Sequence, residues 1–191
     1  ETMLRGDVTA DQLNAYIKEV RAALPARIKI TTAEPWSTWY TTPEVGQNVD
    51  IIFVHLLPYW EGTDIHAAMG FIDKHYDLIA KEFPDKPIVI GEAGWPSEGR
   101  TRGSAVASLA NEAYFVRAFV QLAMEKGYDY YIMEGYDQPW KNSGEGAVGA
   151  YWGLFDATDH PKFNFSGLVR NFPAWKIYAL IAAALTFALG L

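Results

Sequence analysis

The sequence predicts an α/β fold, namely the C-terminal half (strands 5 to 8) of a TIM (β/α)8 barrel, followed by the start of a transmembrane helix. Strand-like and helix-like segments alternate along the 191 residues, which indicates βα units and a parallel sheet. Each strand-like segment also ends in polar or aromatic residues, as barrel strands do at the face that carries function. We therefore expect a barrel domain over residues 1–173 and a truncated membrane segment over residues 174–191, with sequence missing beyond both ends.

The elements follow from periodicity and from residues that begin or end them. Apolar residues at helical spacing predict the three main helices, the first of which begins after Thr9 as N-cap and ends before Pro25. A shorter helix is expected over residues 37–45. The helices are placed at residues 9–24, 64–83 and 104–126, and the strands at 27–32, 49–57, 88–92 and 128–133. A doubly wound open sheet is the alternative architecture, but no glycine-rich phosphate loop opens a helix.

Composition excludes several classes of function. The net charge of −7 disfavours nucleic acid or an anionic membrane surface as the main partner. The chain has no cysteine, and its four histidines are scattered, so neither a thiolate site nor a metal signature is present, and we expect no metal and no cofactor. Aromatic residues reach 15%, more than a core alone usually needs, and sugar rings are natural partners for them.

The most informative stretch is Lys86-Pro-Ile-Val-Ile-Gly-Glu-Ala-Gly-Trp-Pro-Ser97. Its apolar residues predict a buried strand that runs directly into Glu92. Burying an ionised carboxylate costs several kcal/mol unless its neighbours stabilise it, so Glu92 is a candidate functional group, with the Trp of the following turn as an aromatic plane beside it. Alternatively, Glu92 caps the next helix or pairs with Arg100 or Arg102.

Four motifs, in order along the chain, resemble glycoside hydrolase family 17, the β-1,3-glucanases and related transglycosylases. The stretch around Glu92 is similar to the family's nucleophile motif, and Val54-His-Leu-Leu-Pro-Tyr-Trp60 to its sixth strand. Glu134-Gly-Tyr-Asp-Gln-Pro-Trp-Lys141 resembles the eighth-strand motif, and Tyr151-Trp-Gly-Leu-Phe155 a late segment. The resemblance covers Glu1 to about Phe165 and implies a (β/α)8 catalytic domain. Gln138 and Gly149 depart from it, since relatives carry Glu at these two positions, and this leaves fine specificity open.

The resemblance implies a retaining reaction with two glutamates. Glu92 would be the nucleophile, and Glu1, which stands where the family has the Glu of an Asn-Glu pair, would be the acid/base. The alternative for Glu1 is an arbitrary first residue. Such a pair of carboxyls lies about 5 to 5.5 Å apart, with pKa values pushed apart, for example by a cation near Glu92 or a dry pocket around Glu1.

Residues that hold the sugar are also expected from the resemblance. Tyr59 would orient Glu92 through a hydrogen bond, or alternatively fill the barrel mouth. Asp137 and Lys141 match residues that hold sugar hydroxyls, and Glu134 is a substrate contact or a structural acid beneath the site. The candidate stacking platforms, each of which could equally pack a loop, are Trp36, Trp60 and Trp140.

The C-terminal run predicts where the domain works. Residues 177–191 are uncharged and apolar but slightly shorter than the roughly 20 residues of a spanning helix, and a buried C-terminal helix is the alternative. By analogy with a bacterial membrane-linked branch, the domain would remodel β-glucan outside the cytoplasm, and the same analogy implies a fused glycosyltransferase as a partner. Arg170 and Lys176 favour the opposite orientation. The competing function is a non-catalytic glucan-binding or scaffold module of a membrane glucan synthase. We expect the isolated chain to be inactive, because half a barrel leaves open sheet edges.

Overall fold

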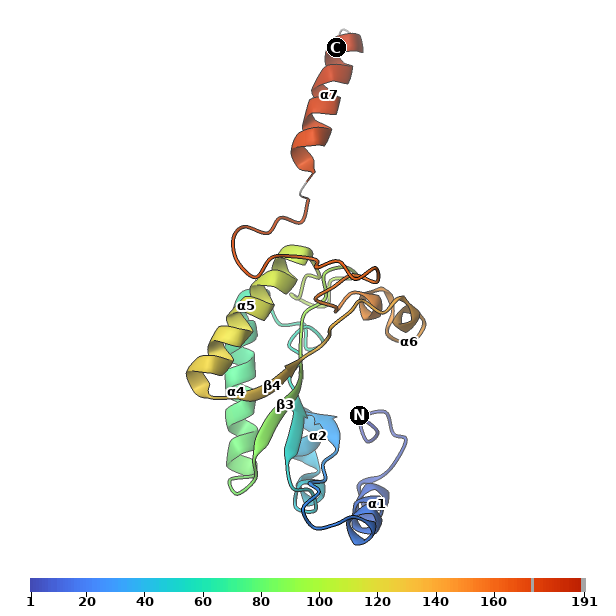
Figure 1. Ribbon diagram of the computed structural model, residues 1–191, viewed down its shortest axis with the longest axis vertical. Helices are drawn as coiled ribbons and strands as arrows, with labels where there is room; N and C mark the ends of the chain where they lie inside the picture. The colour runs from blue at the N-terminus through green and yellow to red at the C-terminus, as the bar shows by residue number, and fades with distance from the viewer. Residues whose placement is uncertain (173, 190–191) are drawn as a thin grey trace.

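A computed structural model describes residues 1–172 and 174–189. Its centre is a parallel sheet with the order β1-β2-β3-β4 (Figure 1). The strands are β1 (Ala33–Pro35), β2 (Ile52–His55), β3 (Ile88–Ala93) and β4 (Asp129–Ile132). Strand order equals chain order and all pairs are parallel, so each connection crosses over in the same direction along the sheet. The predicted α/β class is confirmed, and the open sheet agrees with part of a barrel.

The helices lie close to the predicted ranges because their end signals were readable. Helix α1 (Ala10–Ala23) begins with a capping box between Thr9 and Gln12. Helix α5 (Leu109–Lys126) begins after Ser108, whose side chain accepts from the Asn111 N–H, and ends at Gly127 in the left-handed conformation. The predicted start at residue 104 is wrong, because residues 104–108 form a loop. Four further helical segments lie between β1 and β3 in the chain, namely α2 (Trp36–Thr41), α3 (Pro43–Gly46), the 3-10 turn η1 (Ile65–Ala67) and α4 (Ala68–Glu82).

One face of the sheet forms the core and the other faces away from it. Figure 1 shows α4 and α5 on the same side of β3 and β4. The fully buried residues of the strands alternate along the chain, as a sheet covered on one face requires; they include Ile52, Val54 and Ile90. On the opposite face, Phe53 is half-buried and contacts the largely exposed Tyr131, with their ring centroids 5.6 Å apart. This second face is where a closed barrel would have its interior.

The first strand lies later in the chain than predicted. Residues 27–32 alternate in polarity but form no strand, and Ile28 is exposed. Ile30 still exchanges hydrogen bonds with Asp50, through its N–H to the carboxylate and its carbonyl to the Asp50 N–H. The parallel pairing itself begins at Ala33, opposite Phe53. The strand therefore starts where its neighbour β2 can pair with it, which local polarity does not reveal.

A long loop follows β4 and contains only short helical turns. These are η2 (Pro139–Lys141), α6 (Asn142–Glu145) and η3 (Ala147–Ala150). The Met133 N–H donates to Ala93, and the Glu134 N–H to Trp152, so the loop returns along the end of the sheet. This return places the two later motifs, around Glu134 and Trp152, beside each other.

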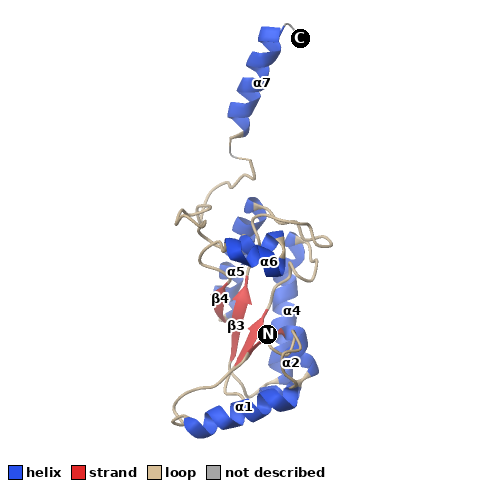
Figure 2. Ribbon diagram, turned by 90° about the vertical axis from the view of Figure 1, so that its right-hand side faces the viewer, coloured by secondary structure: helices blue, strands red, loops and turns tan. Residues whose placement is uncertain are grey.

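The C-terminal helix α7 (Trp175–Leu189) extends apart from the sheet in both views (Figures 1 and 2). None of its 15 residues is buried, which argues against the alternative of a buried helix. Within residues 1–172 and 174–189, no helix is long and apolar enough to cross a membrane, so the predicted span is not found there. The last two residues of the predicted span, and Pro173 at the predicted domain boundary, lie outside the described residues.

Candidate active site

Two neighbouring strand ends bring an acid and a base together. The pairing of β2 with β3 shifts register between Val54 and His55, and the shift sets His55 opposite Glu92. Glu92 lies within β3 rather than on the loop after it. The carboxyl ends of parallel strands share one edge of the sheet, so both side chains reach the same place.

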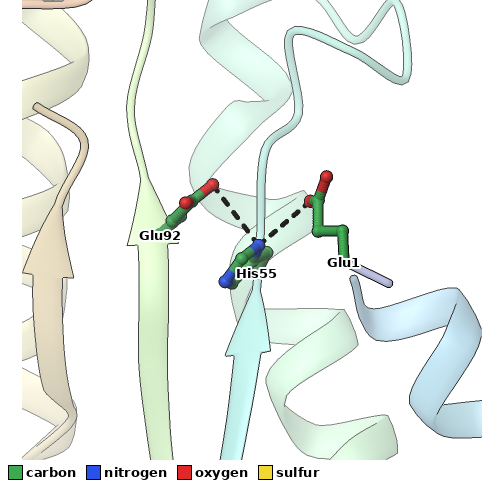
Figure 3. A group of neighbouring side chains, drawn as sticks. All are labelled: Glu1, His55 and Glu92. Atoms are coloured by element: carbon green, nitrogen blue, oxygen red, sulfur yellow. Dashed lines mark hydrogen bonds and ion pairs between the residues drawn. The ribbon is translucent and has the colours of Figure 1, made fainter. Parts of the chain in front are cut away.

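Glu1 completes this cluster from the start of the chain. His55 Nδ1 hydrogen-bonds to Glu1 Oε1 at 3.0 Å and lies 3.3 Å from Glu92 Oε2, so one nitrogen stands between two carboxylates (Figure 3). A carboxylate oxygen of each glutamate and the histidine nitrogen all lie within 4.8 Å of one another. Because an ionised carboxylate only accepts hydrogen bonds, Nδ1 is the donor to Glu1 whenever Glu1 is ionised. Glu92 neither caps a helix nor pairs with Arg100 or Arg102.

The environments of the two glutamates push their pKa values in opposite directions. The hydrogen bond from His55 holds the pKa of Glu1 below its usual value. Burial raises the pKa of Glu92, and the nearby charge of Glu1 adds to the effect, while His55 and Lys141 oppose it. The values are separated, as expected, but in the reverse order to the predicted roles. The reason is that the basic side chain hydrogen-bonds to Glu1 rather than to Glu92.

The carboxylates open into a cleft of about 810 Å³. Its wall includes five of the residues predicted from the sequence, namely Glu1, Trp36, Trp60, Glu92 and Lys141. Trp36 rests on His75, with ring centroids 4.1 Å apart, and its indole N–H donates to Glu61 at 3.3 Å. Trp60 stacks on Trp152. Both indoles are therefore held in place from one side and reach the cleft as half-buried rings.

Two aromatic residues of the motifs lie in the core rather than in the cleft. The Tyr59 hydroxyl donates to the Arg100 carbonyl, not to Glu92, and the side chain is buried. Burial also raises the pKa of this phenol. Trp95, expected as an aromatic plane beside Glu92, is buried and donates to the Val106 carbonyl at 2.9 Å. Both predictions are wrong for the same reason: these rings contact each other and fill the space beneath the strand ends.

Glu134 and Lys141 form an ion pair at the side of the cleft. Lys141 Nζ lies 2.7 Å from Glu134 Oε2, which also accepts from the Gln138 amide at 2.6 Å. Lys141 lines the cleft, whereas Glu134 is held behind it. Trp140 is mostly exposed outside the cleft lining, where its indole donates to Gln138. Glu134 thus matches the alternative of a structural acid, and Gln138 supports it.

Asp137 is placed away from the cleft. Its carboxylate accepts the Gly153 N–H at 2.8 Å and pairs with Lys162 at 2.8 Å. Lys162 also bonds to Glu112, and the three side chains are at most 9% exposed. We call Glu112, Asp137 and Lys162 the buried ion cluster. Asp137 holds the loop after β4 in place there. With Lys162 it lines a second cavity of about 800 Å³ rather than the cleft of Glu92, and its contact with substrate stays a prediction.

A family model described as the BtgE/BtgC glycoside hydrolase domain matches residues 1–153. The chain belongs to this family.

Curated and solved relatives of this glycoside hydrolase family extend beyond the chain. A glucan 1,3-beta-glucosidase of Arthroderma benhamiae is 31% identical over 180 residues, which are 86% of this chain and 58% of that protein. The crystal structure of a glycoside hydrolase family 17 β-1,3-glucanosyltransferase from Rhizomucor miehei superposes with a TM-score of 0.78 at 29% identity, covering 87% of this chain and 62% of that one. An active-site mutant of that enzyme, in complex with laminaritriose, matches equally well. The chain thus spans about three fifths of these relatives, and the resemblance to family 17 is confirmed. The bacterial membrane-linked branch stays a prediction.

The cleft of this glycoside hydrolase domain also contains residues for which the sequence predicted no role, and His55 is one of them. A histidine and an acid at the ends of neighbouring strands are nevertheless a readable signal. Glu145 also lines the cleft. At Gly149, where the resemblance to plant members of family 17 implies a Glu, an added Cβ would lie 2.6 Å from the Cβ of Glu145, so Glu145 occupies the space beside this position.

The cluster of Glu1, His55 and Glu92 is also the group within the described residues that could hold a metal ion. A metal bound to His55 Nδ1 would exclude a hydrogen on this nitrogen. The expectation of no metal stays a prediction.

Proposed function

We propose that this domain carries the catalytic pair of a retaining enzyme acting on β-1,3-glucan. The single observation that carries the proposal is the approach of the Glu1 and Glu92 carboxylates to within 4.8 Å, on the wall of a cleft with two indole rings. Retaining glycosidases hold their carboxyls about 5 to 5.5 Å apart, whereas inverting enzymes need roughly 6.5–9.5 Å to admit a water molecule. The activities of the relatives, a glucan 1,3-beta-glucosidase and a β-1,3-glucanosyltransferase, support the same substrate class.

The reaction would proceed in two displacements. Glu92 attacks the anomeric carbon, the bond to the glycosidic oxygen breaks, and Glu1 gives its proton to that oxygen. Glu1, now a carboxylate, then takes a proton from water or from a sugar hydroxyl, and that oxygen displaces Glu92 from the anomeric carbon. Trp36 and Trp60 would stack on sugar faces, and Lys141 would hydrogen-bond to sugar hydroxyls.

His55 can supply the pKa order that these roles require. Its Nδ1 lies nearly as close to Glu92 as to Glu1, at 3.3 Å and 3.0 Å. A small rotation of the imidazole would transfer its hydrogen bond from Glu1 to Glu92. The pKa of Glu92 would then fall, and the pKa of Glu1 would rise because it loses the hydrogen bond that lowers it. We propose that sugar binding drives this exchange, so that Glu92 is ionised and Glu1 protonated when the bond breaks.

Covalent labelling of the intact protein tests the roles directly. A 2-deoxy-2-fluoro β-laminaribioside with a dinitrophenyl leaving group should accumulate as a covalent adduct, which peptide mapping should locate on Glu92. Glu92→Gln should abolish labelling and lower turnover of laminari-oligosaccharides by at least about 10³-fold. A label on Glu1 would reverse the assignment, and unchanged turnover in Glu92→Gln would favour the non-catalytic binding module.

Product analysis distinguishes hydrolysis from transglycosylation. We propose that a sugar hydroxyl is the main acceptor, in line with the β-1,3-glucanosyltransferase among the relatives. Incubation with laminari-oligosaccharides should then yield products longer than the starting chain. Shorter products alone would show that water is the acceptor.

We also propose that the domain works at a membrane, on its extracytoplasmic side. The support is α7, whose only charged residue is Lys176 and whose residues are all exposed. The intact protein should float with lipid vesicles, and a variant lacking residues 174–191 should not. Equal flotation of both would remove α7 as the membrane contact.

A further inference from the structure

Glu34 is a fully buried carboxylate that the proposed reaction does not use. It lies in β1, the strand beside the one that carries His55, and none of its surface is exposed. Burying a charged carboxylate costs several kcal/mol unless hydrogen bonds compensate. Its location and its partners therefore need an explanation.

All hydrogen bonds of the Glu34 side chain within the described residues go to the three residues that follow Glu1. Oε1 accepts the Met3 N–H at 2.8 Å and the Thr2 hydroxyl at 3.4 Å, and Oε2 accepts the Leu4 N–H at 3.2 Å. The backbone nitrogen of Glu1 lies 3.9 Å from Oε1 as well. One carboxylate thus binds this whole segment to the end of β1, and Figures 1 and 2 both draw the N-terminus beside the sheet.

The residues of this segment also hydrogen-bond to one another, and Met3 packs against the core, but Glu34 is the acceptor for the N–H groups of Met3 and Leu4. Residues 1–8 form turns and belong to no helix or strand, and Leu4 to Asp7 are exposed. Without Glu34, the backbone N–H groups of Met3 and Leu4 would lose their acceptor. Glu1 reaches His55 from this segment and Glu92 lies within β3, so the contacts of Glu34 with the segment help to set the distance between the two carboxylates.

We propose that Glu34 is a positioning residue that sets Glu1 at its working distance from Glu92. The inference rests on the proposed function, because it assigns Glu34 to the step that Glu1 performs. Glu34 does not touch the substrate; it acts through the backbone of residues 3 and 4. A displacement of about 1 Å at a reacting group can cost roughly 10²-fold in rate, so a loosened segment reduces proton transfer without emptying the cleft.

The test compares two substrates in the intact protein carrying Glu34→Gln, which keeps the shape and removes the charge. A laminari-oligosaccharide needs a proton on its leaving oxygen, whereas 2,4-dinitrophenyl β-laminaribioside does not. We expect kcat/KM to fall about 10- to 100-fold for the first and less than about 2-fold for the second. Azide, which attacks without a general base, should restore kcat for the dinitrophenyl substrate.

Three variants make the result decisive. Glu112→Gln changes another buried carboxyl and should leave both kcat/KM values unchanged. Glu34→Asp, which keeps the charge but shortens the reach, should show the same ratio between substrates, and it replaces Glu34→Gln if that variant does not fold. Glu92→Gln tests the proposed function independently, since loss of both activities there confirms the nucleophile whatever Glu34 does. Equal losses on both substrates in the Glu34 variants, or no loss on either, would overturn the positioning role.

Discussion

Two regions of the molecule place two carboxylates around one basic side chain. In the cleft, Glu1 and Glu92 flank His55; in the buried ion cluster, Glu112 and Asp137 flank Lys162. The carboxylates of the first are about one third exposed and those of the second at most 9% exposed. The base also differs, because a histidine exchanges its proton near neutral pH and a lysine does not. The same arrangement of side chains therefore suits proton transfer where the acids are partly exposed around a histidine, and suits holding a loop where they are buried around a lysine.

Replacing Lys162 tests whether the buried ion cluster stabilises the fold. Lys162→Met leaves Asp137 buried without its cation, and we expect the free energy of unfolding to fall by about 3–5 kcal/mol. Turnover per folded molecule should stay within about 2-fold. Denaturant unfolding and laminari-oligosaccharide turnover check the two parts. A variant of unchanged stability but reduced turnover would return Asp137 to the sugar site, as the sequence predicted.

Replacing His55 tests whether this side chain controls the pKa values of Glu1 and Glu92. The His55 hydrogen bond lowers the pKa of Glu1, and its charge opposes the raised pKa of Glu92, so His55→Gln should raise both pKa values. The nucleophile is active above its pKa and the acid below its own, and the whole pH profile of kcat/KM should therefore move to higher pH. We expect a loss of about 10- to 100-fold at neutral pH. A profile that keeps its position would mean that His55 does not control these protons.

A smaller effect is expected on the pH dependence of stability. Burial raises the pKa of Glu112 to about 8, despite the opposing charge of Lys162. Between its ordinary pKa and 8, the folded state holds a proton that the unfolded state releases, so stability falls as the pH rises through this range. Glu112→Gln should flatten the dependence of Tm on pH from about 5 to 8. An unaltered slope would show that Glu112 is ionised beside Lys162.

The smallest effect should follow metal removal. If the cluster around His55 transfers protons, a chelator such as EDTA should leave turnover unchanged, with a metal-dependent hydrolase as the positive control. Loss of activity that zinc restores would instead make Glu1, His55 and Glu92 metal ligands.

The sequence predicted the elements and the acids better than it predicted the aromatic residues. The position of Glu92 could be predicted because the apolar strand before it places it at a strand end. The helix ends could be predicted because Thr9, Pro25 and Gly127 are residues typical of helix starts and stops. Tyr59 and Trp95 follow strand ends, where no periodicity tells a cleft-facing ring from a core ring. Their burial is decided by contacts with each other, across 36 positions of the chain, which local pattern does not encode.

The same limit applies to charged residues. Asp137 and Lys141 stand four positions apart in one motif, yet the loop turns between them, so that one pairs inside the buried ion cluster and the other faces the cleft. The role of Glu34 depends on hydrogen bonds to backbone groups about 30 residues away. Such partners are set by the tertiary fold, and the sequence offers only the hint of an acid at a strand end.

The register shift between Val54 and His55 has a consequence for engineering and for alignment of relatives. The extra residue is Gly91 of β3, because Val54 pairs with Ile90 and His55 pairs with Glu92. Because side chains alternate along a strand, deleting Gly91 would turn Glu92 to the opposite face of the sheet, away from His55. A homologue with one residue fewer here would look almost identical in sequence but would lack the pairing of the acid with the histidine. Gap placement at this single position thus decides whether two family members can be compared chemically.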